Sequence, residues 1–192
     1  MNYTVFKGEL VRLAAIDPEK IGPVFSQWLQ DSEFSRLQDT EVVKVFSPKQ
    51  VQSTFEKILP EGYFFAIHSL ADDRLIGMID LSGFDWPGRN AWVGIGLGER
   101  EYWGKGYGTD AMHVLLRFAF HELNLHRVNL NVFEYNPRAI RCYEKVGFKH
   151  EGHMRACLNR DGRRWDLVYM GILRSEWEER CQGSGIRFQA DR

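Results

Sequence analysis

Hydrophobic and polar residues follow two different periods along the first half of the chain. Residues Gly8–Ile16 form a short, mostly apolar run, which predicts a strand. Asp17 and Pro18 then supply an N-cap and a first-turn proline, and we expect a helix from there to about Leu29. Ser47-Pro48 repeats this arrangement with a capping-box glutamine, and predicts a second helix to about Leu59. The stretch between these helices is polar and has no period, so no element is predicted there.

Three apolar runs follow the second predicted helix. They span Tyr63–Leu70, Leu75–Phe84 and Ala91–Leu97. Turn-forming residues separate them, Ala71-Asp72-Asp73 in the first gap and Trp86-Pro87-Gly88-Arg89-Asn90 in the second. Short strands joined by short turns predict an antiparallel meander.

Helices and strands are predicted to mix in the second half. Thr109–Asn124 carries a polar stripe at helical spacing among apolar residues, which predicts a helix buried on most sides. The alternation in Arg127–Phe133 predicts a strand that pairs in parallel with the meander. A capped helix is expected over Asn136–Val146, followed by strands over Phe148–Leu158 and Arg164–Leu173. The fold class is therefore α+β: a mixed, largely antiparallel central sheet flanked by helices, with one parallel strand-helix-strand unit.

Length and composition limit the class of protein. A chain of 192 residues, 44% hydrophobic and 14% aromatic, is expected to form one globular domain over residues 1–181, with residues 182–192 as a flexible tail. No run approaches the roughly 18 apolar residues of a membrane span, and the first ten residues do not resemble a leader, so a cytoplasmic location is expected. The three cysteines are widely spaced and odd in number, which predicts reduced thiols.

The net charge of −1 excludes binding of nucleic acid through bulk positive charge. The charge is nevertheless divided, with −5 over residues 1–99 and +5 over residues 100–165. An anionic cofactor held by the second half beside a cationic substrate held by the first would produce this division. A chance distribution would produce it as well.

The most specific motif is a glycine-rich segment between a predicted strand and a predicted helix, Tyr102-Trp103-Gly104-Lys105-Gly106-Tyr107-Gly108-Thr109. Alternate glycines let successive backbone N–H groups converge at a helix N-terminus, which favours phosphate. The spacing is neither that of a dinucleotide-binding motif nor that of a P-loop, so hydride transfer and ATP hydrolysis are disfavoured. A tight connection without a ligand is the alternative interpretation.

Two segments resemble the acetyl-CoA signature of the GNAT superfamily of N-acetyltransferases. They run from Arg100 to Ala111 and from Asn136 to Phe148, in the family's order and at its separation. The segment from Glu151 to Asp166 resembles the branch that contains the ribosomal-protein N-terminal acetyltransferases and the polyamine acetyltransferases. The resemblance covers residues 8–178. It implies an acetyl-CoA-dependent N-acetyltransferase in which an amine attacks the thioester directly, in a ternary complex and without a metal.

The resemblance also implies roles for particular residues. Asn136 would bind the pantetheine arm, and Tyr143 would bind the cofactor and protonate the departing thiolate. A backbone N–H near Leu97 would polarise the thioester carbonyl. The pyrophosphate loop and the adjoining strand end would comprise Leu97, Gly98, Glu99, Gly104, Lys105, Gly106, Tyr107, Gly108 and Thr109. A helix N-cap and a packing aromatic are the alternative interpretations of Asn136 and Tyr143.

The chain departs from the family at two positions. Trp103 stands where glutamine or arginine is common, and Val93 stands near a position where a glutamate often serves as the base. The acceptor amine must still lose a proton. We assign Glu99 as the catalytic base, with Asp80, Asp85, His68 or a chain of waters as alternatives. No cysteine is expected beside the site, since Cys142 would point about 100° from Tyr143 on a helix.

Other hypotheses stay open at this point. His150 and His153 should face opposite sides of a strand unless a bulge intervenes, which disfavours a metal site. Four arginines near one hairpin, Arg155, Arg160, Arg163 and Arg164, could contact RNA near ribosomes. A non-catalytic acyl-CoA-binding module is the main rival. The acceptor is expected to be a protein N-terminus, a polyamine, an aminoglycoside or another small amine, with a second positive charge favoured, and a homodimer is possible.

Overall fold

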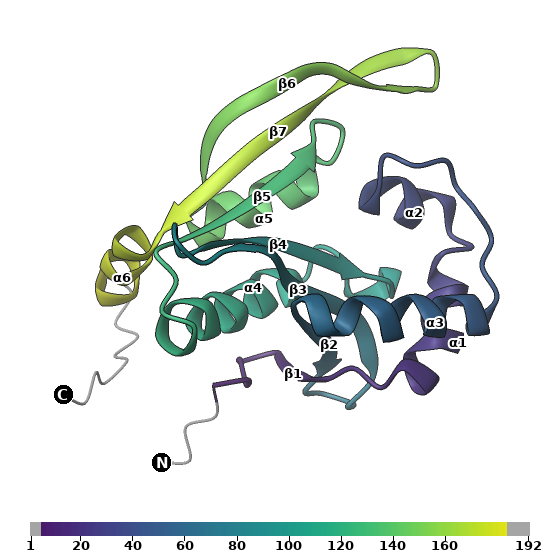
Figure 1. Cartoon of the computed structure of the whole chain (residues 1–192), viewed down its shortest axis with the longest axis horizontal. Coiled ribbons are helices and arrows are strands. Elements are labelled where there is room, and N and C mark those ends of the chain that lie inside the picture. The colour runs from purple at the N-terminus through teal and green to yellow at the C-terminus, as the bar shows by residue number, and fades with distance from the viewer. Residues whose placement is uncertain (1–4, 184–192) are drawn as a thin grey trace.

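The computed structural model describes residues 5–183, and Figure 1 shows a twisted sheet with helices on both faces. The seven strands lie in the order β1-β2-β3-β4-β5-β7-β6. Their bounds are β1 Val11–Ala15, β2 Tyr63–Ser69, β3 Leu75–Asp85, β4 Asn90–Leu97, β5 Arg127–Phe133, β6 Lys149–Arg160 and β7 Arg163–Leu173. Neighbouring strands are antiparallel except for β4 and β5, which pair in parallel. The predicted mixed, largely antiparallel sheet with one parallel unit is confirmed.

Helices divide between the two faces according to their apolar residues. Their bounds are α1 Pro18–Trp28, α2 Ser32–Gln38, α3 Pro48–Ile58, α4 Tyr107–Arg117, α5 Pro137–Val146 and α6 Arg174–Gly183. The larger core joins α4 and α5 to one face of the sheet. A smaller core joins α1 and α3 to the other face, where β2 and β3 supply Ala66 and Met78. None of the helices in residues 5–183 is both long enough and apolar enough to cross a membrane.

Two helices lie where none was predicted. α2 begins after Asp31, whose carboxylate accepts hydrogen bonds from the backbone N–H groups of Glu33 and Phe34. Phe34 is its one buried residue, so its sequence carries no helical period. α6 buries Trp177 among charged neighbours, and it includes residues 182 and 183 of the predicted tail. The rest of that tail lies outside the described residues.

Predicted boundaries shift where side chains compete for backbone groups. β1 begins at Val11 rather than Gly8 because the Asp110 carboxylate accepts hydrogen bonds from the N–H groups of Glu9, Leu10 and Val11. α4 begins two residues before Thr109, and a π-helical turn over Phe118–Glu122 continues it. These contacts tie the first strand to the helix that follows the glycine loop.

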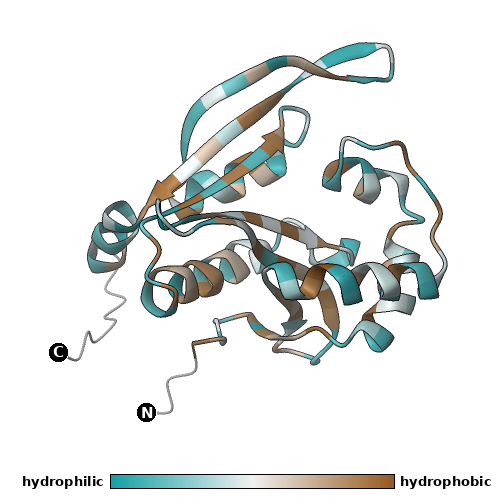
Figure 2. Ribbon diagram, in the orientation of Figure 1, coloured by the Kyte–Doolittle hydropathy of each residue, from teal (hydrophilic) through white to brown (hydrophobic). Residues whose placement is uncertain are grey.

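The hairpin of β6 and β7 forms the far edge of the sheet, and Figure 2 shows that β6 is largely hydrophilic. Its register shifts between His150 and Gly152 and again between Met154 and Leu158. The first shift is the bulge that the prediction for His150 and His153 allowed for, and it places the two side chains on the same face. Their partners on β7, Met170 and Val168, are two residues apart, and residues two apart on a strand share a face.

Candidate active site

A cavity of about 570 Å³ opens where β4 and β5 separate. The parallel pairing covers only Asn90–Trp92 against Arg127–Asn129, and beyond it the two strands diverge. The cavity is lined from both faces of the sheet, by α4 and α5 on one side and by α2 on the other. It therefore passes through the sheet, and a group in the gap between the strands can be approached from either face.

The glycine loop forms one end of this cavity. Gly104 and Gly106 have φ values of +72° and +92°, a backbone region that favours glycine. Gly106 is the N-cap of α4, and no side chain caps the first turn of this eleven-residue helix. The N–H groups of that first turn are thus left to a ligand, and the helix dipole favours an anion there. This arrangement fits a phosphate or pyrophosphate group.

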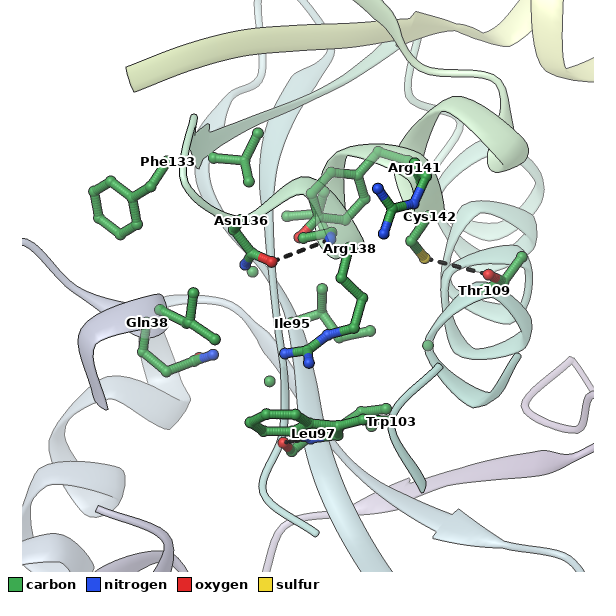
Figure 3. A pocket seen from close by; sticks show the side chains of 18 of the residues that line it. Gln38, Ile95, Leu97, Trp103, Thr109, Phe133, Asn136, Arg138, Arg141 and Cys142 are labelled. Carbon is green, nitrogen blue, oxygen red and sulfur yellow. Dashed lines mark hydrogen bonds between the residues drawn. The ribbon is translucent and has the colours of Figure 1, made fainter. Parts of the chain in front are cut away.

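Three cationic side chains of α5 line the same part of the cavity: Arg138, Arg141 and Lys145. The Arg138 guanidinium lies 3.8 Å from the centre of the Trp103 ring, which holds it over the cavity as Figure 3 shows. Burial lowers the pKa of Arg138, which remains a cation. These charges fit the phosphates of coenzyme A, and they explain in part why residues 100–165 carry positive charge.

The exposed edge of β4 supplies backbone groups to the gap. The Gly98 N–H donates to the Ile76 carbonyl oxygen of β3 at 3.0 Å. Because alternate residues of an antiparallel pair direct their N–H and C=O groups to the partner strand, those of Leu97 point the other way, toward β5. The Leu97 carbonyl oxygen accepts a hydrogen bond from Trp103 Nε1 at 2.7 Å. Trp103 thus binds the Leu97 carbonyl oxygen, and the Leu97 N–H is the other backbone group that this residue directs into the gap.

Asn136 and Tyr143 lie on α5 and both line the cavity. Asn136 Oδ1 caps α5 by accepting from the Ala139 N–H at 3.1 Å, which leaves the side-chain NH₂ as a donor. The N-cap interpretation and the ligand interpretation of Asn136 are therefore compatible. Burial raises the pKa of Tyr143, so its phenol stays protonated at neutral pH but is a weaker acid than an exposed tyrosine.

Cys142 lines the cavity as well, which corrects the expectation that no cysteine lies beside the site. The cavity extends along α5 far enough to meet two successive side chains. Cys142 Sγ lies 3.3 Å from Thr109 Oγ1 (Figure 3), and burial raises the pKa of the thiol. A thiol with a raised pKa is a poor nucleophile at neutral pH, so direct transfer without an acetyl-enzyme is still expected.

On the other face of the sheet, β4 and the residue that follows it present glycine at alternate positions, Gly94, Gly96 and Gly98. A Cβ at each would lie within 3 Å of a side chain from another element: Asp80 of β3, Gln38 of α2 and Trp28 of α1. The absence of side chains on this face of β4 lets all three approach the strand closely. The α2-side part of the cavity, which we name the acceptor chamber, is lined by Phe34, Leu37, Gln38, Asp80, Ser82, Trp92, Asn131 and Phe133.

Asp80 is the one carboxylate among the described residues that line the cavity. Its Oδ2 accepts a hydrogen bond from Ser82 Oγ at 2.9 Å. Burial raises its pKa to about 6, against the smaller opposite effect of Ser82. Its neighbours across the sheet are Phe64 on β2 and Gly94 on β4, and neither titrates. A carboxylate in this setting can accept a proton near neutral pH.

Glu99, the predicted base, lies outside the cavity lining. One of its carboxylate oxygens accepts from Trp28 Nε1 at 2.8 Å, and the other pairs with Arg74 at 2.5 Å. Both oxygens are therefore committed to holding α1 and the start of β3 against the end of β4. The geometry does not favour Glu99 as a catalytic group.

Some of the remaining predicted site residues line the cavity and others lie outside it. Those that line the cavity are Leu97, Gly104, Gly106, Gly108, Thr109, Asn136 and Tyr143. Gly98, Lys105 and Tyr107 lie outside the lining. Gly98 makes room for the Trp28 ring, Lys105 is exposed on the loop, and Tyr107 packs edge-on against Tyr102.

Two alternative bases also lie away from the cavity. Asp85 holds the turn after β3 by accepting from the Gly88 N–H and from Asn90 Nδ2. His68 Nδ1 lies 2.9 Å from the Asp73 carbonyl oxygen, at the opposite end of β2. Of the side chains that the sequence left open as bases, Asp80 alone reaches the cavity.

Sequence reasoning missed most of the acceptor chamber. Phe34, Leu37 and Gln38 belong to a helix that was not predicted, and Trp92 and Phe133 were assigned only to strands. One signal was present: glycine at every second position of Gly94–Gly98 marks a strand face against which other elements pack closely.

The arrangement matches known proteins. A family model described as an acetyltransferase (GNAT) domain covers residues 11–149. The chain belongs to the GNAT acetyltransferase family. The prophage-derived N-acetyltransferase YokL of Bacillus subtilis is 32% identical over 179 residues, which are 93% of this chain and 98% of YokL. This GNAT protein is thus an acyltransferase.

Other relatives differ in their named substrates. The putative ribosomal N-acetyltransferase YdaF of Bacillus subtilis is 38% identical over 57% of this chain and 59% of YdaF. Spermidine N(1)-acetyltransferase of Vibrio cholerae is 34% identical over 58% of this chain and 64% of its own. A crystal structure of the Vibrio cholerae enzyme with CoA and spermine has a TM-score of 0.78 at 24% identity, over 88% of this chain and 98% of the other, which supports the fold.

Three of the four hairpin arginines of this GNAT protein, Arg160, Arg163 and Arg164, have partners within the chain. Arg160 donates to the carbonyl oxygens of Arg36, Asp39 and Glu41, and Arg163 lies 3.9 Å from the centre of the Trp165 ring. These contacts do not support an RNA-binding role. His150 lies 3.0 Å from Glu144, and within residues 5–183 no three His, Cys, Asp or Glu side chains are grouped as metal ligands.

Proposed function

We propose that this protein transfers an acetyl group from acetyl-CoA to a primary amine, by direct attack of the amine in a ternary complex. The observation that carries the proposal is the cavity that passes through the sheet, with Tyr143 on the α5 side and Asp80 on the α2 side. The uncapped N-terminus of α4 and the cations of α5 support binding of coenzyme A at the first side. The amine would then approach from the acceptor chamber.

Each side of the cavity supplies what one half of the reaction needs. When bound, acetyl-CoA supplies the activated acetyl group. Asp80 accepts the proton that the amine must lose before or during attack. The Leu97 N–H, directed into the gap, can donate to the carbonyl oxygen as negative charge develops there. Tyr143 donates its phenolic hydrogen toward the departing sulfur. Because burial makes Tyr143 a weak acid, hydrogen-bond donation contributes more than complete proton transfer.

The relatives support amine acceptors in general, since one is named for spermidine and another for ribosomal targets. Membership of the ribosomal-protein branch stays a prediction. The rival hypothesis of a non-catalytic acyl-CoA-binding module gains no support from the cavity, because both a proton acceptor and a proton donor line it.

Tyr143→Phe tests the proposal. With acetyl-CoA and 2-phenylethylamine, spermidine and butylamine as acceptors, the wild-type protein is expected to release thiol together with an equal amount of acetylated amine. The variant should lower kcat at least about tenfold on the best of these amines, while the Kd of acetyl-CoA changes less than about threefold. Tyr63→Phe, a tyrosine that packs against Phe84 and Phe118 away from the cavity, is the control.

Two results would contradict this function. Thiol release without any acetylated amine would show that the protein binds acetyl-CoA without using it for transfer. A full kcat in Tyr143→Phe would reduce that residue to a packing role. Mass spectrometry of the amine product distinguishes transfer from hydrolysis of the thioester.

A further inference from the structure

The acceptor chamber has a composition that discriminates among amines. Its walls carry four large apolar side chains, Phe34, Leu37, Trp92 and Phe133. The polar groups beside them are the neutral Gln38, Ser82 and Asn131. Asp80 is the sole anion among its described lining residues, so one ammonium group can find an opposite charge there. A second ammonium group in the same chamber would meet apolar surface or neutral groups.

Acidic residues at the start of α2 and in the β6–β7 turn form ion pairs with arginines. Asp31 and Glu33, at the start of α2, both pair with Arg100 at 2.5 and 2.7 Å. Asp161, in the β6–β7 turn, pairs with Arg36 at 2.9 Å. None of these three acids is among the described residues that line the cavity, so they do not add a second carboxylate to Asp80 in the chamber.

The cationic side chains on the coenzyme A side of the cavity also disfavour an acceptor with a second positive charge. Arg138, Arg141 and Lys145 outnumber Asp80 within the lining, and Figure 3 shows Arg138 across the cavity from Gln38 of α2. The phosphates of coenzyme A would take up much of this positive charge. The phosphates would lie at the α4 end of the cavity. They therefore leave the acceptor chamber with no further negative group that could pair with a second ammonium of the acceptor.

One wall of the chamber is held closed by long-range contacts. The Phe133 ring stacks on Tyr135 with centroids 5.1 Å apart, and Tyr135 Oη donates to the Arg36 carbonyl oxygen at 2.6 Å. Arg160 of β6 donates to the same carbonyl oxygen, also at 2.6 Å. These bonds join α2 to the hairpin beside the chamber. A long chain leaving on that side would have to break them, whereas a compact molecule would not.

We infer that the acceptor is a small primary amine with a single positive charge, whose amine-bearing carbon is joined to a compact apolar group, preferably an aromatic ring. This inference rests on the proposed function. The amine lies at Asp80, and the apolar group packs among Phe34, Leu37, Trp92 and Phe133. Rings of this kind pack well edge-on or offset against aromatic walls. Polyamines and aminoglycosides, which carry several charges, fit this chamber poorly.

The test compares acceptors at a saturating concentration of acetyl-CoA. We expect kcat/KM for 2-phenylethylamine to exceed that for 1,4-diaminobutane and spermidine at least about tenfold, because an unpaired buried charge is costly. The ratio should change less than about threefold between 0.05 and 0.5 M salt, since it depends on burial rather than on a long-range field. A tetrapeptide with an N-terminal phenylalanine presents the same chemistry on a longer chain and should be acetylated more slowly than 2-phenylethylamine.

A charge placed in the chamber tests the cause of the preference. Leu37→Glu adds a second carboxylate to the chamber that Asp80 lines and should raise the rate on 1,4-diaminobutane relative to 2-phenylethylamine at least about tenfold. Leu37→Gln, of nearly the same size but neutral, is the matched comparison, because it removes the same apolar contact without adding a charge. The ratio in Leu37→Glu should exceed the ratio in Leu37→Gln at least about fivefold, and equal ratios in the two variants would contradict a role for charge.

The outcomes separate this inference from the function on which it rests. Equal or faster acetylation of spermidine by the wild-type protein would overturn the inference and leave acetyl transfer intact. Faster acetylation of the tetrapeptide would overturn the assignment to a small molecule. If no amine is acetylated although acetyl-CoA binds, the proposed function itself fails and the inference fails with it.

Discussion

Asp80 differs from the other acids of the chain in what surrounds it. Glu99, Asp31 and Asp161 each pair with an arginine. Asp80 instead accepts a hydrogen bond from the Ser82 hydroxyl and lies against Gly94 of β4. Paired carboxylates are stabilised as anions and give little basicity, while an unpaired buried carboxylate has a raised pKa. The residue suited to accept a proton is thus the one that the surrounding structure stabilises least.

Asp80→Asn is expected to lower kcat about 100- to 10,000-fold, within the usual range for loss of a general base. In the wild-type protein, kcat/KM should fall as the pH drops below about 6, because the protonated carboxyl cannot accept a proton. The variant should lose this acidic limb, and Asp85→Asn, at the turn after β3, should keep it. An unchanged limb in Asp80→Asn would assign it to another group.

The same substitution has a predicted effect on stability. The folded-state pKa of Asp80 is raised from 3.8 to about 6, so folding is penalised above pH 6 and the penalty disappears as the pH falls below about 4. Asparagine removes the buried charge, and the free energy of unfolding at pH 7.5 should rise by about 1 to 2 kcal/mol. The gain should shrink at pH 4.5 in urea unfolding. A variant less stable than the wild type at pH 7.5 would contradict this account.

At the scale of the element, the glycine loop depends on backbone conformation more than on its lysine. Gly106 has φ +92° and ends the loop as the N-cap of α4. Gly108 lies within α4, and a Cβ there would make only ordinary contacts at 3.8–4.0 Å, so its lack of a side chain is not required for the fold.

Gly106→Val is therefore expected to weaken coenzyme A binding at least about tenfold, because a branched residue disfavours the left-handed region that presents the first turn of α4. Gly106→Asn is the matched comparison, since asparagine tolerates that region, and it should lose no more than about threefold. Calorimetry with coenzyme A measures both. Equal affinities of the two variants would reject a role for this backbone conformation.

The helices differ in how well their sequences predicted them. α1 and α3 each have proline at the first position and bury apolar residues at helical spacing, Ile21 and Trp28 in α1 and Val51 and Phe55 in α3, so caps and period agree. α2 has the cap but only Phe34 buried, and it is held by contacts from residues about 100 or more positions away, among them Tyr135 and Arg160. A short helix stabilised by distant residues leaves no period in its own sequence.

At the scale of the whole molecule, Arg160 connects the N-terminal and C-terminal parts around the acceptor chamber. Arg160→Met keeps much of the side-chain volume but removes the hydrogen bonds to the carbonyl oxygens of Arg36, Asp39 and Glu41. We expect the KM for 2-phenylethylamine to rise about three- to tenfold, with the Kd of coenzyme A unchanged. Amide exchange in residues 32–41 should become faster.

Arg163→Met is the control for this change, because Arg163 lies in the same hairpin but packs on Trp165. It should leave both the KM and the exchange rates near those of the wild type. A coenzyme A affinity that falls together with acceptor affinity in Arg160→Met would indicate a general loss of structure instead.

The sequence by itself determined the succession of strands and of most helices along the chain, the parallel unit and the glycine loop, because these depend on local period, caps and turns. It also determined the family. It did not determine that β7 lies between β5 and β6 in the sheet. Nor did it determine which acid faces the reacting groups. Alternation places Asp80 and Ser82 on one face of β3, but only the packing of α2 over the glycines of β4 encloses that face. Glu99 follows the end of β4, but its contacts with Arg74 and Trp28 hold its carboxylate outside the cavity. Such choices arise from contacts between residues far apart in the chain, which no local pattern records.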